Sequence, residues 1–259
     1  RNLNGRLASA VWAARSCVKA VLTSPDIPFN EGVKRPIHVT APYGSLLNPR
    51  PPAPVRARLE ASYRVFNAVM KALAQAAPDR VIASGFDTTT VGCFSFLGPQ
   101  GYRVYLEVFG GGYGASALGD GCDAVDAPLS NCSNTPIEAM DMEYDYIRVV
   151  EYALVPDSGG LGRHRGGLGF VRRYAVLKDG VTFALYADRF KGRPDGVFGG
   201  DAGTLGRCEV WRGGRVIQLK SKDSMTLAKG DIVSLQMGGG AGYGPLAERP
   251  AALVERDLA

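Results

Sequence analysis

The sequence predicts an α+β fold in which N-terminal helices are followed by a glycine-rich, mostly β second half. Two observations carry this prediction. Apolar residues recur at helical spacing in residues 6–22 and 56–76. Beyond residue 80 the chain changes to short runs of β-branched and aromatic residues, bounded by glycine, proline or aspartate. We therefore expect a helical part over about 1–80 and a β-rich part over about 81–259, with no linker between them.

The first predicted helix covers residues 6–22, because apolar side chains repeat there every three or four positions, and it ends at the prolines of SPDIP. The second, over 56–76, shows the strongest helical pattern in the chain and closes near Pro78. Between the two helices, IHVTAP (residues 37–42) is predicted to be a short strand. The following GSLLNPRPPAPV is predicted to be an extended loop, because a residue before proline is pushed out of the helical region.

The second half of the chain is predicted to consist mainly of strands. Its apolar and aromatic runs are each closed by turn-forming residues, and the 34 glycines and 16 prolines of the 259 residues fall in clusters between such runs. The predicted strands are YRVYLEVF, YIRVVEYAL, GFVRRYAVL, VTFALYA, CEVWRGG and DIVSLQM.

Composition narrows the function classes. The chain is 46% hydrophobic with a net charge of +5, but its basic residues are scattered, which argues against a nucleic-acid-binding surface. No apolar run is long enough to cross a membrane. The five cysteines are widely spaced and form no CxxC pair, so neither a zinc site nor a disulfide framework is expected, and a reducing cytoplasm fits best. Because the chain opens at Arg1 without methionine or a signal peptide, we expect this start to be an interior point of a longer protein.

The stretch SGGLGRHRGGLG, residues 158–169, contains six glycines, two arginines and one of the two histidines. It cannot be a Walker loop, because no glycine in it is followed by Lys and then Ser or Thr. Glycine suits both a backbone that approaches a ligand and a tight connection between strands. The sequence leaves both interpretations open.

Two further glycine clusters follow strand-like runs. GGGYGA, residues 110–115, contains a GxGxxA match, but glycine and proline follow where a dinucleotide fingerprint requires a helix. Free backbone amides that bind an anion are still possible there. GGGAGYGP, near the C-terminus, is cut short by Pro245 and is predicted to be a turn or a tail.

The run SNCSNTPIEAMDMEY, residues 130–144, predicts a short helix with Pro136 at its first position and Asn134 or Thr135 as the cap. In one interpretation Glu138 only stabilises the positive end of the helix dipole. In the other it is a general base or a ligand-binding carboxylate. Spacing alone does not decide between them.

Metal-ligating residues are few. The two histidines, His38 and His164, are too few for a histidine-based metal site within the chain. Asp120, Asp123 and Asp126 are candidate carboxylate ligands, but aspartate beside glycine is more often a turn former. We therefore assign no metal ligands to this chain.

Taken in order along the chain, several motifs resemble the hydantoinase B and 5-oxoprolinase family. The resemblance covers nearly the whole chain, and its most specific part is PDSGG followed by RGGLG. The matching stretches are NEGVKRPIHVTAPYGSLLNPRPPAPV, ALAQAAPDRV, FGGGYGA, SNTPIEAM, PDSGGLGRHRGGLGFVRRY, DRFKGRPDGVFGG and KGDIVSLQMGGGAGYGPL.

This resemblance implies that residues 1–259 form the C-terminal half of a B-type subunit. The missing N-terminal half is then expected to be a partner and to hold the family's divalent metal. One departure is visible: the family often has a histidine shortly before SNCSNTP, where this chain has Asp126, Ala127 and Pro128. A catalytic role for that histidine is therefore in doubt here.

The resemblance also implies chemistry. An A-type partner that binds ATP would phosphorylate an amide or ketone oxygen, and the B-type subunit would complete the reaction. Hydrolysis of a cyclic amide is the leading expectation; carboxylation of a ketone and a non-catalytic assembly role are the alternatives. Within this chain the expected catalytic residues are Glu138, Arg163 and Arg165, and the expected substrate-binding residues are Gly111, Gly112, Asp120, Asn134, Ser158 and Gly159.

Overall fold

The computed structural model describes residues 4–55, 58–130 and 132–258. The start at Arg1 and the first two residues of the helix expected over 56–76 therefore lie outside the described residues. The helices are α1 (Leu7–Leu22), α2 (Glu31–Lys34), α3 (Arg58–Leu73), α4 (Ile137–Glu143) and α5 (Ala251–Leu258), with short 3₁₀ turns at Pro78–Arg80 and Leu246–Glu248. The strands are β1 (Thr90–Gly98), β2 (Gly101–Phe109), β3 (Ile147–Leu154), β4 (Phe170–Val176), β5 (Val181–Tyr186), β6 (Arg207–Arg212), β7 (Arg215–Gln218), β8 (Lys222–Leu227) and β9 (Ile232–Gln236).

The predicted α+β class is confirmed. The strands form two antiparallel sheets, one in the order β2-β1-β5-β8 and the other in the order β3-β4-β9-β6-β7. Aromatic side chains of both sheets meet between them: the ring of Phe94 lies 4.7 Å from that of Phe183 in its own sheet and 4.9 Å from that of Tyr174 in the other. Both sheets therefore bury one face in a shared core, as a β-sandwich does.

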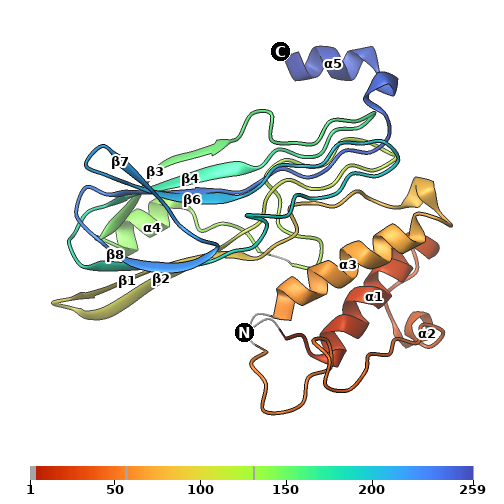
Figure 1. Ribbon diagram of the computed structural model, residues 1–259, viewed down its shortest axis with the longest axis horizontal. Helices are drawn as coiled ribbons and strands as arrows, with labels where there is room; N and C mark the ends of the chain where they lie inside the picture. Colours follow the sequence, from red (N-terminus) through yellow and green to blue (C-terminus); the bar gives the residue numbers. More distant parts are fainter. Residues whose placement is uncertain (1–3, 56–57, 131, 259) are drawn as a thin grey trace.

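The N-terminal helices form a separate layer at the lower right of Figure 1, below the extended segments that continue from the sheets. Helices α1 and α3 pack together through a small apolar cluster that contains Cys17, Phe66 and Met70. Burial raises the pKa of the Cys17 thiol to about 12, so this cysteine is a packing residue and not a nucleophile. No described helix is both long and apolar enough to cross a membrane.

Extended, glycine-rich segments run side by side from one end of the sandwich and lie between α5 and the N-terminal helices (Figure 1). We call residues 110–122, 158–169, 196–203 and 238–244 the glycine layer. Its segments are joined by backbone hydrogen bonds: the amide of Gly167 donates to Tyr113 (2.8 Å), that of Gly240 to Gly167 (2.9 Å), and that of Gly160 to Gly240 (2.8 Å).

The glycines in this layer permit close backbone contact. A Cβ added to Gly112 would lie 1.9 Å from the carbonyl oxygen of Gly167, and one added to Gly240 would lie 2.0 Å from that of Tyr113. None of the six glycines in residues 158–169 has a positive φ. These glycines are therefore required by the close spacing of neighbouring backbone segments and not by tight turns.

Several sequence-based expectations are wrong. Residues 37–42 form no strand: the carbonyls of Ile37 and Ala41 accept hydrogen bonds from the side chains of Arg15 and Asn48 and not from a neighbouring strand. Residues 238–244 are no tail: they are buried within the glycine layer. Strands β1, β7 and β8 were not expected; β1 contains Gly92 and Gly98, which weaken the strand pattern, but it pairs with β2 and β5 on both sides. The helix at 137–143 is confirmed, but its N-cap is Pro136, and neither Asn134 nor Thr135 caps it.

A buried carboxyl lies where α3 meets the start of β1. Glu60 is 3% exposed and accepts hydrogen bonds from the amide of Thr89 and the hydroxyl of Thr88. Burial raises the pKa of Glu60 to about 7, although these hydrogen bonds oppose the shift. The folded protein therefore retains this proton to a higher pH than the unfolded chain does.

This pKa makes stability depend on pH. The stabilising contribution of the protonated Glu60 is complete below the unfolded pKa and is lost as the pH rises through about 7. We expect the free energy of unfolding to fall by about 2 kcal/mol between about pH 5 and about pH 8, and Glu60→Gln to abolish most of this fall. Urea unfolding of both proteins at the two pH values measures it. An equal fall in both would assign the dependence to other groups.

Candidate functional site

The candidate site is a hollow of about 740 Å³ beside the glycine layer and the C-terminal helix. It brings together three of the expected site residues, Asp120, Gly159 and Arg165. Residues that the sequence did not single out complete its lining, among them Arg256 and Asp257 of α5. The hollow is therefore lined by charged groups from segments far apart in the sequence.

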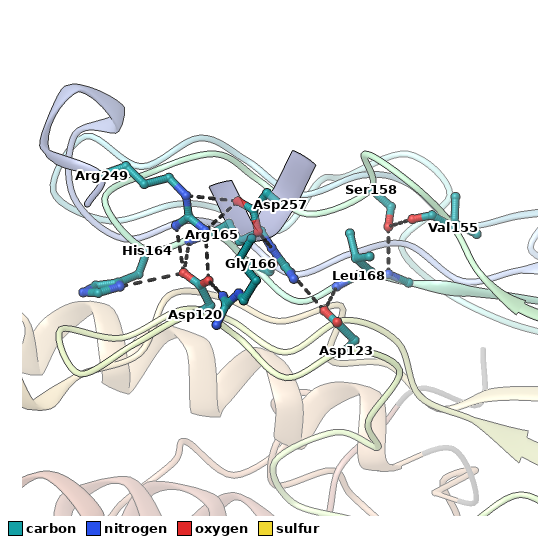
Figure 2. Close-up of polar contacts among 12 residues, drawn as sticks. Asp120, Asp123, Val155, Ser158, His164, Arg165, Gly166, Leu168, Arg249 and Asp257 are labelled. Carbon is teal, nitrogen blue, oxygen red and sulfur yellow. Dashed lines mark hydrogen bonds and ion pairs between the residues drawn. The ribbon is translucent and has the colours of Figure 1, made fainter. Parts of the chain in front are cut away.

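Asp120 is the centre of the charged cluster (Figure 2). Its carboxylate accepts hydrogen bonds from both terminal nitrogens of Arg249, at 2.9 and 3.0 Å, from the amide of Arg165 at 2.8 Å, and from Arg256. Burial opposes ionisation of this carboxyl, but the hydrogen bonds from Arg249 and Arg165 outweigh it, so the pKa of Asp120 lies below its usual value. Asp120 is thus an ionised anchor for the C-terminal segment.

Arg165 is held by two carboxylates. Its guanidinium lies 3.0 Å from Asp123 and 3.2 Å from Asp257, and it also donates to the carbonyl of Gly166 (Figure 2). Asp257 in turn pairs with Arg249 at 2.6 Å. The positive charge of Arg165 is already neutralised within the chain, so this residue fixes α5 to the glycine layer.

Arg163 differs from its neighbour. Its side chain is exposed and takes part in none of the hydrogen bonds or ion pairs among the described residues. His164, between the two arginines, is buried, with Nδ1 3.7 Å from Asp120, and its backbone pairs with that of Tyr243. Of the two arginines in residues 158–169, only Arg163 therefore has a guanidinium that is free to bind an external anion.

Ser158 and the two expected glycines of residues 110–115 are engaged inside the protein. The Ser158 hydroxyl accepts from the amide of Gly169 (2.8 Å) and donates to the carbonyl of Val155 (2.7 Å) (Figure 2). The amides of Gly111 and Gly112 donate to the carbonyls of Val125 and Gly238. Their expected role in substrate binding stays a prediction, and their positions favour a packing role.

Asn134 lines a different hollow, of about 410 Å³, at the ends of β2, β3 and β4. Its amide nitrogen donates to the carbonyl of Val108 (3.2 Å), and its oxygen accepts from the hydroxyl of Tyr152 (2.6 Å). Asp126, which stands near the position of the family histidine, caps the loop by accepting from the amides of Ala127 and Cys132, both at 2.8 Å. This hollow is a second candidate for a small-molecule pocket.

Glu138 lies in the first turn of α4, as expected, but it is exposed and lines none of the hollows described here. Its catalytic role stays a prediction. Across the described residues, no three side chains of His, Cys, Asp or Glu converge on a point where they could hold a metal ion. The divalent metal expected on the N-terminal half stays a prediction.

A buried ion pair next to the second hollow was not anticipated from the sequence. Arg172, fully buried, donates to Glu107 (2.8 Å) and to the carbonyl of Thr135 (3.0 Å), and Glu107 also accepts from Tyr174 (3.1 Å). The alternation of side chains along β4 could have predicted that Arg172 is buried, since Phe170, Arg172 and Tyr174 lie on the same face. This pair ties β2, β4 and the start of α4 together.

Comparisons with known proteins agree with this architecture. The B-type subunit of a putative D-/L-hydantoinase from a Pseudomonas species is 37% identical over 229 residues, which cover 87% of this chain and 38% of the relative. The crystal structure of an ATP-dependent caprolactamase from Pseudomonas jessenii superposes with a TM-score of 0.79 at 24% identity, over 97% of this chain and 45% of that one. A nucleotide-free acetone carboxylase also superposes with a TM-score of 0.79, at 17% identity, over 99% of this chain and 39% of that one.

This chain therefore spans less than half the length of each of these three proteins. The two superpositions, at their low sequence identity, show a shared fold. The sequence profile described as hydantoinase B/oxoprolinase matches residues 1–246, which leaves only the last residues of the chain, including α5, outside the match. The chain belongs to the hydantoinase B/oxoprolinase family.

Proposed function

We propose that this chain is part of the B-type subunit of an enzyme that hydrolyses a cyclic amide at the expense of ATP. The observation that carries the proposal is the 37% identity to the B-type subunit of a putative hydantoinase over 87% of the chain. The shared fold with an ATP-dependent caprolactamase supports the same class of substrate.

The chemical logic is that an unactivated lactam is a poor electrophile. Phosphorylation of its carbonyl oxygen by an ATP-binding A-type partner gives an imidate with a good leaving group. Water then adds to the activated carbon, and the C–N bond of the tetrahedral intermediate breaks, so that the ring nitrogen leaves as a protonated amine and the ring opens to an acyl phosphate. A second water hydrolyses the acyl phosphate to a carboxylate and inorganic phosphate. Groups that neutralise the developing negative charge lower the barrier to this step.

Within this chain we assign that task to Arg163, and we propose Glu138 separately as a carboxylate that activates water. Neither residue lines the two hollows described above. Arg163 is exposed and unpaired among the described residues, whereas Arg165 is neutralised by Asp123 and Asp257. Both assigned side chains lie on the surface of this chain, so their reacting partners must come from elsewhere in the assembly. The N-terminal half of the B-type subunit and the A-type subunit are the proposed partners.

The two arginines are expected to respond oppositely to replacement. Arg163→Ala should change the free energy of unfolding by no more than about 0.5 kcal/mol, but lower turnover of the assembled enzyme more than about tenfold, because a charge-assisted contact is lost. Arg165→Ala should cost about 1 to 3 kcal/mol of stability, because Asp123 and Asp257 lose their partner. Thermal melting and coupled measurements of ATP use and product separate the two effects. Normal product formation per ATP in Arg163→Ala would remove this residue from the reaction.

The proposal is tested with the enzyme assembled by co-expression of this chain with A-type and N-terminal B-type partners. We expect ATP-dependent ring opening of hydantoin, 5-oxoproline or caprolactam, seen by mass spectrometry as the addition of water. A mixture that lacks ATP is the control. An assembled complex that opens none of these rings would contradict the proposal.

The shared fold with acetone carboxylase supports one alternative, an ATP-dependent ketone carboxylase. The same assembled enzyme, given acetone and ¹³C-labelled bicarbonate, distinguishes the two. Label in a new carboxylate, without ring opening, would favour carboxylation. A complex that forms but performs neither reaction would favour a non-catalytic assembly role.

A further inference from the structure

The outer face of β1 and β2 is apolar. Cross-strand pairs place Leu97 opposite Tyr102 and Cys93 opposite Leu106 on this face, which also carries Val104. Four of these side chains are strongly exposed: Leu97 by 73%, Tyr102 by 67%, Leu106 by 53% and Val104 by 42%. The hairpin lies at the end of the sandwich remote from α5 (Figure 1).

This face carries no charged side chain on either strand. The residues that point outward from β1 and β2 are Val91, Cys93, Ser95, Leu97, Tyr102, Val104, Leu106 and Val108. The charged residues of β2, Arg103 and Glu107, point to the opposite face, where they find partners in Asp145 and Arg172. The charged side chains of β2 thus point inward, and its aliphatic side chains point outward.

The outer face of the second sheet carries charged pairs as well as apolar side chains such as Val216. There Arg173 pairs with Glu151, and Arg207 lies 3.8 Å from Glu209. A sandwich in water normally presents such polar residues on both outer faces. Within the first sheet the uncharged apolar surface is limited to the β1–β2 side, since the far strand β8 presents Lys222, Ser224 and Thr226.

We infer that the outer face of β1 and β2 is the surface on which the rest of a hydantoinase B-type chain packs. This inference rests on the proposed function, in that it takes the chain to work as one part of a B-type subunit. Contiguous exposed apolar side chains are typical of a protein–protein interface, and obligate interfaces are more hydrophobic than transient ones.

The lengths of the relatives indicate that the rest of the B-type chain is what covers this face. The region matched to this chain is only 38% of the B-type chain of the putative hydantoinase and 45% of the caprolactamase chain. In such proteins more than half of the polypeptide must therefore be accommodated around this fold. We take this remaining part to be permanently associated with the fold. An uncharged face fits a permanent partner better than a transient one, because transient interfaces retain more polar groups.

The test is co-expression of this chain with a tagged polypeptide comprising the part of the Pseudomonas hydantoinase B-type chain outside the matched region. We expect a 1:1 complex by light scattering, and its loss on Leu106→Lys or Val104→Lys. Val216→Lys is the matched control, because Val216 of β7 is 57% exposed on the outer side of the other sheet. Thermal melting checks that each variant is folded; two variants on the face guard against misfolding of one.

A complex that survives both lysine variants, or that Val216→Lys disrupts equally, would overturn the inference. So would the absence of a complex with the wild-type chain. A homodimer that Leu106→Lys dissociates would assign the face to a second copy of this chain. Because complex formation is measured and not turnover, an active assembled enzyme whose complex tolerates Leu106→Lys would refute this surface while leaving the proposed function intact.

Discussion

Gly167→Ala is expected to prevent stable folding. A Cβ at this position would lie 1.9 Å from the carbonyl oxygen of Cys122 and 2.9 Å from the amide nitrogen of Tyr113, both backbone atoms. These two atoms are hydrogen-bonded to each other, since the amide of Tyr113 donates to the carbonyl of Cys122 (2.9 Å), and Gly167 is held beside them by donating to the carbonyl of Tyr113. We expect a loss of about 3 kcal/mol or more in the free energy of unfolding, seen as insoluble protein or a large drop in Tm.

Gly119→Ala is the matched control. Gly119 lies in the same glycine-rich region, has no atom within 4 Å of an added Cβ, and does not have a positive φ. This change should leave stability unchanged or raise it by a few tenths of a kcal/mol, roughly, because alanine restricts the unfolded chain. If Gly167→Ala folds normally and only fails to bind substrate, the glycines of residues 158–169 serve a ligand and not the packing of the layer.

The second large effect is expected at the buried ion pair. Arg172→Met removes a fully buried guanidinium and leaves Glu107 buried without its cationic partner. Breaking such a pair from one side typically costs about 3 to 5 kcal/mol. The measurement is urea unfolding of the two proteins, followed by tryptophan fluorescence.

The neighbouring arginine provides the control. Arg173 pairs with Glu151 on the half-exposed outer face of the second sheet, so Arg173→Met should cost less, about 1 kcal/mol. The double variant Arg172→Met/Glu107→Gln should recover part of the loss, because the uncompensated charge is removed as well. Equal destabilisation by Arg172→Met and Arg173→Met would show that the buried pair contributes nothing beyond an ordinary surface contact.

The candidate site could be anticipated only in part. Asp120, Gly159 and Arg165 were expected from the glycine-rich motifs, and the structure brings them to one hollow. Arg249 and Asp257, which contact Asp120 and Arg165, were not anticipated, since Arg249 lies 129 residues from Asp120 along the chain. Local pattern carries no information about pairings at this sequence separation.

By itself the sequence determined the fold class, helices over 6–22 and 56–76 that the structure describes at 7–22 and 58–73, and six of the nine described strands, because apolar periodicity and turn residues act locally. It also determined the family, through motifs that span nearly the whole chain. Only the tertiary structure decided why the glycines are there and which arginine is free. Gly112, Gly167 and Gly240 are required by backbones that come from distant segments, and Arg165 is neutralised by Asp123 and Asp257 while Arg163 is not. The need for these glycines and the pairing of the arginines both depend on which segments of the chain lie side by side. That is a property of three-dimensional packing, which neighbouring residues in a sequence do not encode.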